Sequence, residues 1–487
     1  MKPNARKAFV FALLSAFVLS MCAAPVTIVQ TQVVTIVETQ VVTVVETQIV
    51  NQTQVVEEEV VITATPSPIS GEVTAMLIGK PDEDTIDPVT GAPQPGVGQL
   101  EAMFEEAYPN IDLSIINIPW GSGATAYSAK TESMIQAQEA CIYHMPGAFA
   151  FGRRGYLENL DPWMANDPTF ADVWAGDNLE QWRGWGPGNP DNQWALPYSG
   201  GNRVIHWDSV LFEQWGIEPL SLHPTLEEIE EKAAAMTGIN PVTGEQNYGY
   251  WYQGKYLNWQ FQVIAHAFGA TWGQVNADGT WTINWDTPEY LQGLEWLVKM
   301  SQYAPPGALA ADVMPEGFLT DENVVAIIPE GETGYYLVPF ITQPELQERY
   351  RTTYNIVGPD GKGGLFIADP LAMSTACPNK AAAWEVMKWL AGSAESQKYN
   401  FDAGGNLPVI EGAEDVIPAL GALKDAEPIL YANGLAEIRY PWASSEPRFA
   451  LQAALEAALA GTLSPKAALE QAQAETDAWL AEQAAGQ

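Results

Sequence analysis

The sequence predicts an α/β fold with a mainly parallel sheet, and three observations lead to this prediction. From residue 71 onward, short apolar segments alternate with segments of helical periodicity. Hydrophobic residues make up 47% of the 487-residue chain, which is enough for a buried core and excludes global disorder. After the N-terminus, no apolar run approaches the roughly 18 residues that a membrane-spanning helix needs.

The N-terminus has the organisation of an export signal. Three basic residues precede an apolar run at 8–19, which is too short to cross a bilayer and fits a secretory signal. The run ends in Leu-Ser-Met-Cys, which resembles a bacterial lipobox with Cys22 as the lipidated residue. Met21 departs from that pattern, so an ordinary signal peptide with a chance cysteine is the alternative. We predict a lipoprotein signal peptide at 1–21 and a lipid anchor on the outer face of the cytoplasmic membrane.

Residues 22–70 have low complexity and repeat an octad of Thr, Gln, Val and Glu, first at 31–38 and again at 39–46. We expect a spacer that holds the following domain away from the membrane. Because Val/Thr runs have high β propensity, an edge strand or a self-associating segment is the alternative.

Strand and helix candidates alternate at the start of the globular region. Strands are predicted at 72–78, 112–118 and 141–144, and helices at 99–108 and 124–138. Ligands of parallel α/β sheets bind beyond the carboxyl ends of the strands, so loops 80–87, 120–123 and 144–147 are the candidate binding loops. The C-terminal part is mainly helical, with amphipathic helices predicted at 380–390 and from Ser464-Pro465 to about residue 482.

The composition argues against several kinds of chemistry. A net charge of −38 argues against nucleic acid as a partner, because phosphate binding needs a basic surface. The four histidines lack zinc-site spacing, and the acidic residues of the first loop lack the order of a calcium loop, so we expect no metal and no cofactor. No nucleophile motif is present. Paired carboxylates for glycoside hydrolysis remain an open but unspecific alternative among 60 acidic residues.

Aromatic residues stand beside polar and Gly/Pro-rich loop residues at 119–123, 251–256 and 331–336. A sugar ring has apolar C–H faces and hydroxyl edges, so a sugar site combines flat aromatic faces with fixed hydrogen-bonding groups. These loops favour a carbohydrate ligand.

Four stretches then resemble one family in the same order along the chain. They are 197–214 (PYSGGNRVIHWDSVLFEQ), 323–331 (NVVAIIPEG), 368–390 (ADPLAMSTACPNKAAAWEVMKWL) and 454–480. Together they resemble the extracellular solute-binding proteins of ABC importers, specifically the sugar-type family that includes maltose-binding protein. Tyr198 and His206 depart from the family pattern, and Trp207 stands where a tyrosine is usual.

The resemblance implies a two-lobe, periplasmic-binding-protein-like fold with a hinge and a ligand cleft between the lobes. The first lobe would comprise 71–198 and 327–363, and the second 199–326 and 364–487. Such a protein binds without catalysis, because the lobes close around the ligand like a hinge. We expect a monomer that is not an enzyme.

The ligand-binding residues implied by this map come from both lobes and the hinge. Aromatic side chains would stack on the sugar, while carboxylate, amide and hydroxyl groups would bind its hydroxyls. The candidates are Asp82, Trp120, His144, Tyr198, Ser199, Trp251, Tyr256, Glu330, Asn406 and Trp442. On the same map Cys141 and Cys377 fall in different lobes, where a bond would oppose opening, so we expect two free thiols.

The sequence therefore predicts a lipid-anchored binding subunit that captures an extracellular carbohydrate, an oligosaccharide or a disaccharide, and delivers it to ABC transporter permease subunits. Besides a purely structural surface protein, two alternatives stay open. One is a binder of another polar solute, such as a glycerol-phosphate-like anion, which would need Arg153, Arg154, Arg183 and Arg203 to converge. The other is a secreted acidic glycoside hydrolase.

Overall fold

The structure is a computed structural model, and all its described residues belong to one compact unit, Pro66–Gln487. The described residues are 69–86, 92–119, 124–176, 178–183, 192–276, 280–311, 314–361, 363, 366–422 and 446–485. The predicted signal peptide, Cys22 and all but the last two residues of the predicted spacer lie outside them.

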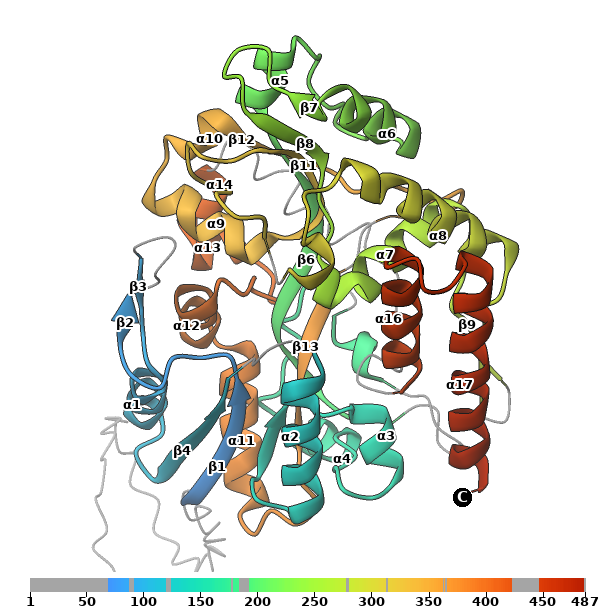
Figure 1. The fold of residues 1–487 in the computed structure, drawn as a ribbon. Helices are drawn as coiled ribbons and strands as arrows, with labels where there is room; N and C mark the ends of the chain where they lie inside the picture. The colour runs from blue at the N-terminus through green and yellow to red at the C-terminus, as the bar shows by residue number, and fades with distance from the viewer. Residues whose placement is uncertain are drawn as a thin grey trace, which may run out of the picture. The chain divides into compact units, whose positions relative to one another are not determined.

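One half of the central sheet is built on parallel strands (Figure 1). Its strands are β4 (Ile111–Ile118), β1 (Gly71–Ile78), β5 (Ile142–His144) and β13 (Phe366–Met373). β1 pairs in parallel with β4 and with β5, whereas β13 is antiparallel to β5. Residues Ala75 to Ile78 of β1 are all buried, as expected for an inner strand covered on both faces, while the edge strand β4 carries exposed residues between its buried ones.

The long strand β6 (Leu196–Asp208) joins this half of the sheet to a second half (Figure 1). The second half contains β11 (Val325–Glu332), β8 (Gln246–Tyr250), β7 (Gly238–Ile239) and β12 (Tyr350–Thr353). β6 pairs with β13 up to Asn202 and with β11 from Arg203 onward. A single strand therefore changes its pairing partner between two adjacent residues.

Helices pack around both halves of the sheet, α1 against β4, α11 against β1 and β6, and α6 against β8. The helices are α1 (Val97–Ala107), α2 (Ala124–Ala137), α3 (Ala148–Arg153), α4 (Asp161–Asn166), α5 (Ser209–Trp215), α6 (Leu226–Ala235), α7 (Leu257–Ala267), α8 (Pro288–Met300), α9 (Thr333–Thr342), α10 (Leu346–Arg349), α11 (Lys380–Gly392), α12 (Ala394–Gly404), α13 (Ala413–Val416), α14 (Pro418–Ala422), α16 (Glu446–Leu459) and α17 (Pro465–Ala485). Within the described ranges, none of them has both the length and the apolar character to cross a membrane.

Minor strands form two separate pairs, β2 (Thr85–Ile86) with β3 (Pro93–Gln94) and β9 (Gly273–Val275) with β10 (Trp281–Ile283). The predicted helices and strands are confirmed to within a few residues at their ends. The predicted start of the last helix is also confirmed, because Ser464 Oγ accepts a hydrogen bond from the Ala467 N–H at 3.3 Å.

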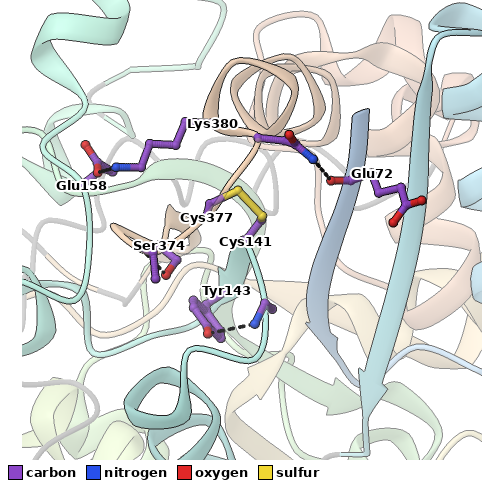
Figure 2. Close-up of a disulfide and its surroundings, with 10 residues drawn as sticks. Glu72, Cys141, Tyr143, Glu158, Ser374, Cys377 and Lys380 are labelled. Atoms are coloured by element: carbon purple, nitrogen blue, oxygen red, sulfur yellow. Dashed lines mark hydrogen bonds and ion pairs between the residues drawn. A yellow bond between two sulfur atoms is a disulfide. The ribbon is translucent and has the colours of Figure 1, made fainter. Parts of the chain in front are cut away.

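The prediction of two free thiols was wrong, because Cys141 and Cys377 form a disulfide with their Cα atoms 4.6 Å apart. Cys141 directly precedes β5, and Cys377 lies in the turn between β13 and α11 (Figure 2). That turn is further held by hydrogen bonds from the Ser374 N–H to the Cys141 carbonyl (2.8 Å) and from Lys380 Nζ to Glu158 Oε1 (2.5 Å).

The error has a physical reason in the strand order. The prediction assumed that residues 364–487 lie apart from the strand at 141–144. In the structure β13 pairs antiparallel with β5, with Met373 opposite Ile142, so the residues just beyond these strand ends are neighbours. A bond between them joins two adjacent strands of one half of the sheet.

Candidate functional site

Buried polar side chains gather where β1 and β5 end and where β6 and β13 run side by side. Lys80 follows β1, His144 is the last residue of β5, and Asp369 lies in β13 opposite Ser199 of β6. We refer to Lys80, His144, Tyr198, Ser199, Asp369 and Asn406 as the polar cluster. It lies at the carboxyl ends of parallel strands, where α/β sheets bind ligands.

Lys80 is the buried cation of the polar cluster, with only 4% of its surface exposed. Its Nζ donates a hydrogen bond to Asn406 Oδ1 at 2.8 Å and lies 5.8 Å from the centre of the Tyr198 ring. Burial lowers the pKa of Lys80 to about 7, although the charge of Asp369 opposes this shift. The ammonium group is therefore poised to gain or lose its proton near neutral pH.

His144 is neutral and presents an N–H group to the polar cluster. Its Nδ1 accepts a hydrogen bond from the Ile78 N–H at 3.2 Å, so the proton of the neutral ring resides on Nε2. Nε2 is buried, lies 4.0 Å from Asp369 Oδ2, and has no hydrogen-bond partner among the described residues. Burial, and secondly the charge of Lys80, hold the pKa of His144 well below its usual range.

Asp369 is the carboxylate of the polar cluster, with 13% of its side chain exposed. Ser199 Oγ donates a long hydrogen bond of 3.5 Å to Asp369 Oδ2. The neighbouring Tyr198 is fully buried and packs edge-on against the His144 ring, with ring centres 5.0 Å apart. Burial, reinforced by the charge of Asp369, raises the pKa of the Tyr198 hydroxyl well above its usual value.

A second asparagine connects the polar cluster to an exposed carboxylate. Asn117, in β4, accepts the backbone N–H of Lys80 at 3.0 Å and donates its amide to Asp82 Oδ1 at 3.0 Å. Asp82 is exposed, and Asn406 is partly exposed. These two side chains form the solvent-facing rim of the polar cluster.

Two of the predicted aromatic residues lie elsewhere, next to α7. Trp251 follows β8 and is buried in the hydrophobic core, and its carbonyl accepts a weak hydrogen bond from Gln260 at 3.4 Å. Tyr256 is partly buried and packs against the same core just before α7. Both side chains pack against the hydrophobic core, and their role in ligand binding stays a prediction.

The remaining predicted residues cannot be placed as side chains. Trp120 and Trp442 lie outside the described residues, as does the side chain of Glu330, whose backbone belongs to β11. Of the predicted residues, the structure brings together Asp82, His144, Tyr198, Ser199 and Asn406. Whether they bind a ligand stays a prediction.

The sequence reasoning missed two central members, Lys80 and Asp369. Lys80 carried one usable signal, since it stands two residues after the apolar segment 75–78 and lies in a loop already considered. Asp369 interrupts the apolar segment of β13, which is unfavourable for a buried strand unless the carboxylate has partners. Neither signal shows that the two residues meet in the fold.

The polar cluster offers several donors and one carboxylate within a small volume. Such a set suits hydroxyl groups, each of which donates one hydrogen bond and accepts others. Across the described part of the chain, no group of three or more His, Cys, Asp or Glu residues is placed to hold a metal ion.

Comparisons with known proteins agree with this fold. Residues 85–397 match the family model of the bacterial extracellular solute-binding proteins. The fold is similar to that of the ABC substrate-binding protein Lmo0181 from Listeria monocytogenes in complex with cycloalternan, with 18% identity, a TM-score of 0.66, and coverage of 83% of this chain and 97% of that chain.

Two further solved structures are similar to this chain. Maltose-bound MalE3 of T. maritima has 16% identity and a TM-score of 0.65, covering 83% of this chain and 98% of that chain. UgpB from Mycobacterium tuberculosis, in complex with glycerophosphocholine, has 16% identity and a TM-score of 0.64, covering 80% and 95%. The family match spans more than half of the sequence, so the chain belongs to the bacterial extracellular solute-binding proteins and has their two-lobe α/β fold.

Proposed function

We propose that this protein is the substrate-binding lipoprotein of an ABC importer, and that it captures an extracellular carbohydrate for delivery to a membrane permease. The observation that carries the proposal is the polar cluster, with its buried lysine, histidine N–H and carboxylate at the ends of parallel strands. Hydroxyl-rich solutes match such a set of donors and acceptors. The proposed ligand is an oligosaccharide or a disaccharide.

The ligands of similar structures support this class of solute. Lmo0181 was solved with cycloalternan and MalE3 with maltose, and other similar proteins were solved with D-mannitol and α-D-tagatose. These are uncharged polyhydroxy compounds.

The strand pairing supports one refinement of the proposed lobes. β13 pairs with β5, and α11 packs on β1. We therefore assign residues 366–404 to the first lobe, together with 71–198, rather than to the second. The second lobe would then be built around β8, β11 and β12, and β6 would cross between the two.

Export and anchoring are parts of the same proposal. The Cys141–Cys377 disulfide supports an oxidising location outside the cytoplasm, because disulfides rarely persist in reducing compartments. Lipidation of Cys22 and a spacer at 22–70 would place the folded, monomeric unit near its permease.

A polar anion is the second candidate solute, because UgpB was solved with glycerophosphocholine. The arginines considered for an anion make different contacts. Arg183 is paired with Asp161 at 2.9 Å and with Glu180 at 3.3 Å. Arg154 instead lies over the rings of Phe151 and Tyr156. These contacts engage two of the four arginines and lend the anion no support.

A thermal-shift screen with product analysis tests the proposal. Maltose, longer maltodextrins, D-mannitol and sn-glycerol 3-phosphate are added to the purified protein, and each mixture is analysed for released products. We expect a neutral sugar or polyol to raise the melting temperature reversibly and without turnover. Stabilisation by the phosphate ester alone would favour the anion binder, and product release would show a glycoside hydrolase. A flat response to every sugar would reject the proposal.

A further inference from the structure

β4 is an edge strand of the central sheet, with β1 as its strand partner on one side and no strand on the other among the described residues. The carbonyl groups of Asn110 and Ile118 accept N–H groups from the first residue of β1 and from the residue after it, at 3.2 and 2.8 Å. Backbone groups of successive residues in a strand point to opposite sides, so even-numbered residues of β4 bond to β1. The N–H groups of Leu113 and Ile115 therefore point to the open side.

Two glutamates of α1, which packs against β4 (Figure 1), reach these N–H groups. Glu105 Oε1 accepts the Leu113 N–H at 3.2 Å, and Glu101 Oε1 accepts the Ile115 N–H at 2.6 Å. Four residues of a helix span about 6 Å and two residues of a strand span about 6.6 Å, so the two spacings match. One face of the helix thus supplies an acceptor to each of two successive outward N–H groups.

The rest of the open side is treated in the same way. The Ile111 N–H, which also points outward, donates to the Tyr108 carbonyl at 3.0 Å. Neither Glu101 nor Glu105 forms an ion pair within the described ranges, so the contact that each carboxylate makes is with the backbone of β4. An exposed edge normally offers its N–H and carbonyl groups to any further strand, and here the donors from Ile111 to Ile115 are already used.

The chain itself contains a segment that is suited to pair with an open edge. Residues 31–50 (TQVVTIVETQVVTVVETQIV) consist largely of Val, Ile and Thr, contain no proline, and carry only two charged residues, Glu38 and Glu46. High β propensity with low charge and no proline is typical of segments that add to exposed strands. Every copy of the protein offers this Val/Thr repeat to its neighbours.

We propose that Glu101 and Glu105 protect β4 from strand addition by the Val/Thr repeat, residues 31–50, of a second copy. A strand that adds to a sheet gains its affinity from main-chain hydrogen bonds to the edge. Here it would first have to displace two charge-assisted hydrogen bonds, which are stronger than those between neutral groups. This inference goes beyond the proposed function and does not depend on which solute is bound.

The first experiment measures the molar mass of the purified protein, with its spacer retained, by size-exclusion chromatography with light scattering. The test variant is Glu101→Ala/Glu105→Ala. The control, Glu106→Ala/Glu295→Ala, removes the same charge from exposed positions of α1 and α8. We expect the wild type and the control to be monomers and the test variant to form dimers or larger species. A monomeric test variant would overturn the proposal.

A second pair of substitutions identifies the strand that adds. Val37→Pro/Val45→Pro places a proline in each of two octads of the repeat, where it removes a backbone donor and prevents strand pairing. Combined with Glu101→Ala/Glu105→Ala, it should restore the monomer. Prolines in the spacer cannot correct a folding defect in α1, so this result would also exclude misfolding as the cause of association. Association that persists would overturn the assignment to the repeat.

Glutamine variants and amide hydrogen exchange test the hydrogen bonds themselves. Glu101→Gln/Glu105→Gln loses the charge but keeps an oxygen acceptor at each position, so it should remain largely monomeric. In the proline background, exchange at Leu113 and Ile115 should be about tenfold faster in the alanine variant than in the wild type, which corresponds to the loss of a hydrogen bond of about 1.4 kcal/mol. Equal exchange in both would overturn the protective role of the glutamates.

The readouts are molar mass and amide exchange, and neither requires a ligand. A sugar screen without any response would therefore reject the proposed function and leave this inference standing. An unprotected edge that stays monomeric would reject this inference and leave the proposed function standing.

Discussion

At the scale of single residues, Asp208 is a buried carboxylate with several partners in the second half of the sheet. Its side chain is fully buried, accepts hydrogen bonds from Arg349 Nε at 2.9 Å and from Asn323 at 2.7 Å, and forms an ion pair with Arg349 Nη2 at 2.8 Å. It also caps α5 by accepting the backbone N–H groups of Val210 and Leu211. One carboxylate thus fixes a helix start, a loop and a strand end.

We predict that Asp208→Ala lowers the free energy of unfolding by about 3–5 kcal/mol, because it leaves Arg349 with only the exposed Asp321 as a partner and removes the acceptor of the Asn323 amide and of two N–H groups of α5. Urea denaturation measures the change. Asp402→Ala is the matched control, since Asp402 is a solvent-exposed partner of Lys398 and should cost less than about 1 kcal/mol. Equal losses in the two variants would show that the Asp208 network contributes nothing beyond surface pairing.

The candidate site illustrates which single residues a sequence reveals. His144 and Ser199 were predicted, because one ends a strand and the other lies in the stretch that carries the family resemblance. Lys80 and Asp369 were missed, because their role depends on β13 running beside β6, and no local pattern encodes that contact. Trp251 was predicted to stack on a ligand; its side chain is buried in the core, as aromatic loop residues pack as readily as they bind, and its role in ligand binding stays a prediction.

At the scale of elements, the disulfide joins β5 to the turn before α11. It connects cysteines separated by 236 residues, so it removes considerable freedom from the unfolded chain. We predict that the double variant Cys141→Ala/Cys377→Ala loses about 2–5 kcal/mol of unfolding free energy. Peptide mapping without reductant should recover the two cysteine peptides linked, and their recovery as separate thiols would contradict the bond.

The contact between β8 and α6 depends on the absence of a side chain at Gly249. A Cβ atom at this position would lie 1.9 Å from the Ala233 carbonyl oxygen in α6. We predict that Gly249→Ala pushes the helix away and lowers the melting temperature by several degrees. Gly98→Ala in α1 is the control, because a Cβ there meets nothing within 4 Å and should be neutral or stabilising by about 0.5–1 kcal/mol. Similar melting temperatures for both variants would refute the clash.

Most elements were predictable because their signals are local. The apolar segment at 72–78 and the Ser464-Pro465 helix start needed only periodicity and capping chemistry. The strand order was not predictable, since β13 inserts between β5 and β6 from far along the chain. That long-range insertion is also the reason for the wrong prediction about the cysteines.

At the scale of the whole molecule, two buried histidines set the response to mild acid. Burial lowers the pKa of His206 to about 3 and that of His144 well below its usual value. Below pH 6.5 both histidines take up protons in the unfolded chain but not in the folded protein. Their contribution to the free energy of unfolding is therefore fully present above about pH 6.5 and decreases as the pH falls. Each contributes a slope of about 1.4 kcal/mol per pH unit.

We predict that the unfolding free energy decreases by about 2–3 kcal/mol between pH 6 and pH 5, as measured by urea denaturation. His206→Gln should reduce that slope by about half, whatever its effect on stability at pH 7. An unchanged slope would mean that His206 can be protonated in the folded state.

The change of partner along β6 has a mechanical consequence. Up to Asn202 the strand is bonded to β13, and from Arg203 onward it is bonded to β11. β6 is therefore held by different strands on the two sides of the Asn202–Arg203 peptide link, and a bend there would change the relative orientation of the two halves of the sheet.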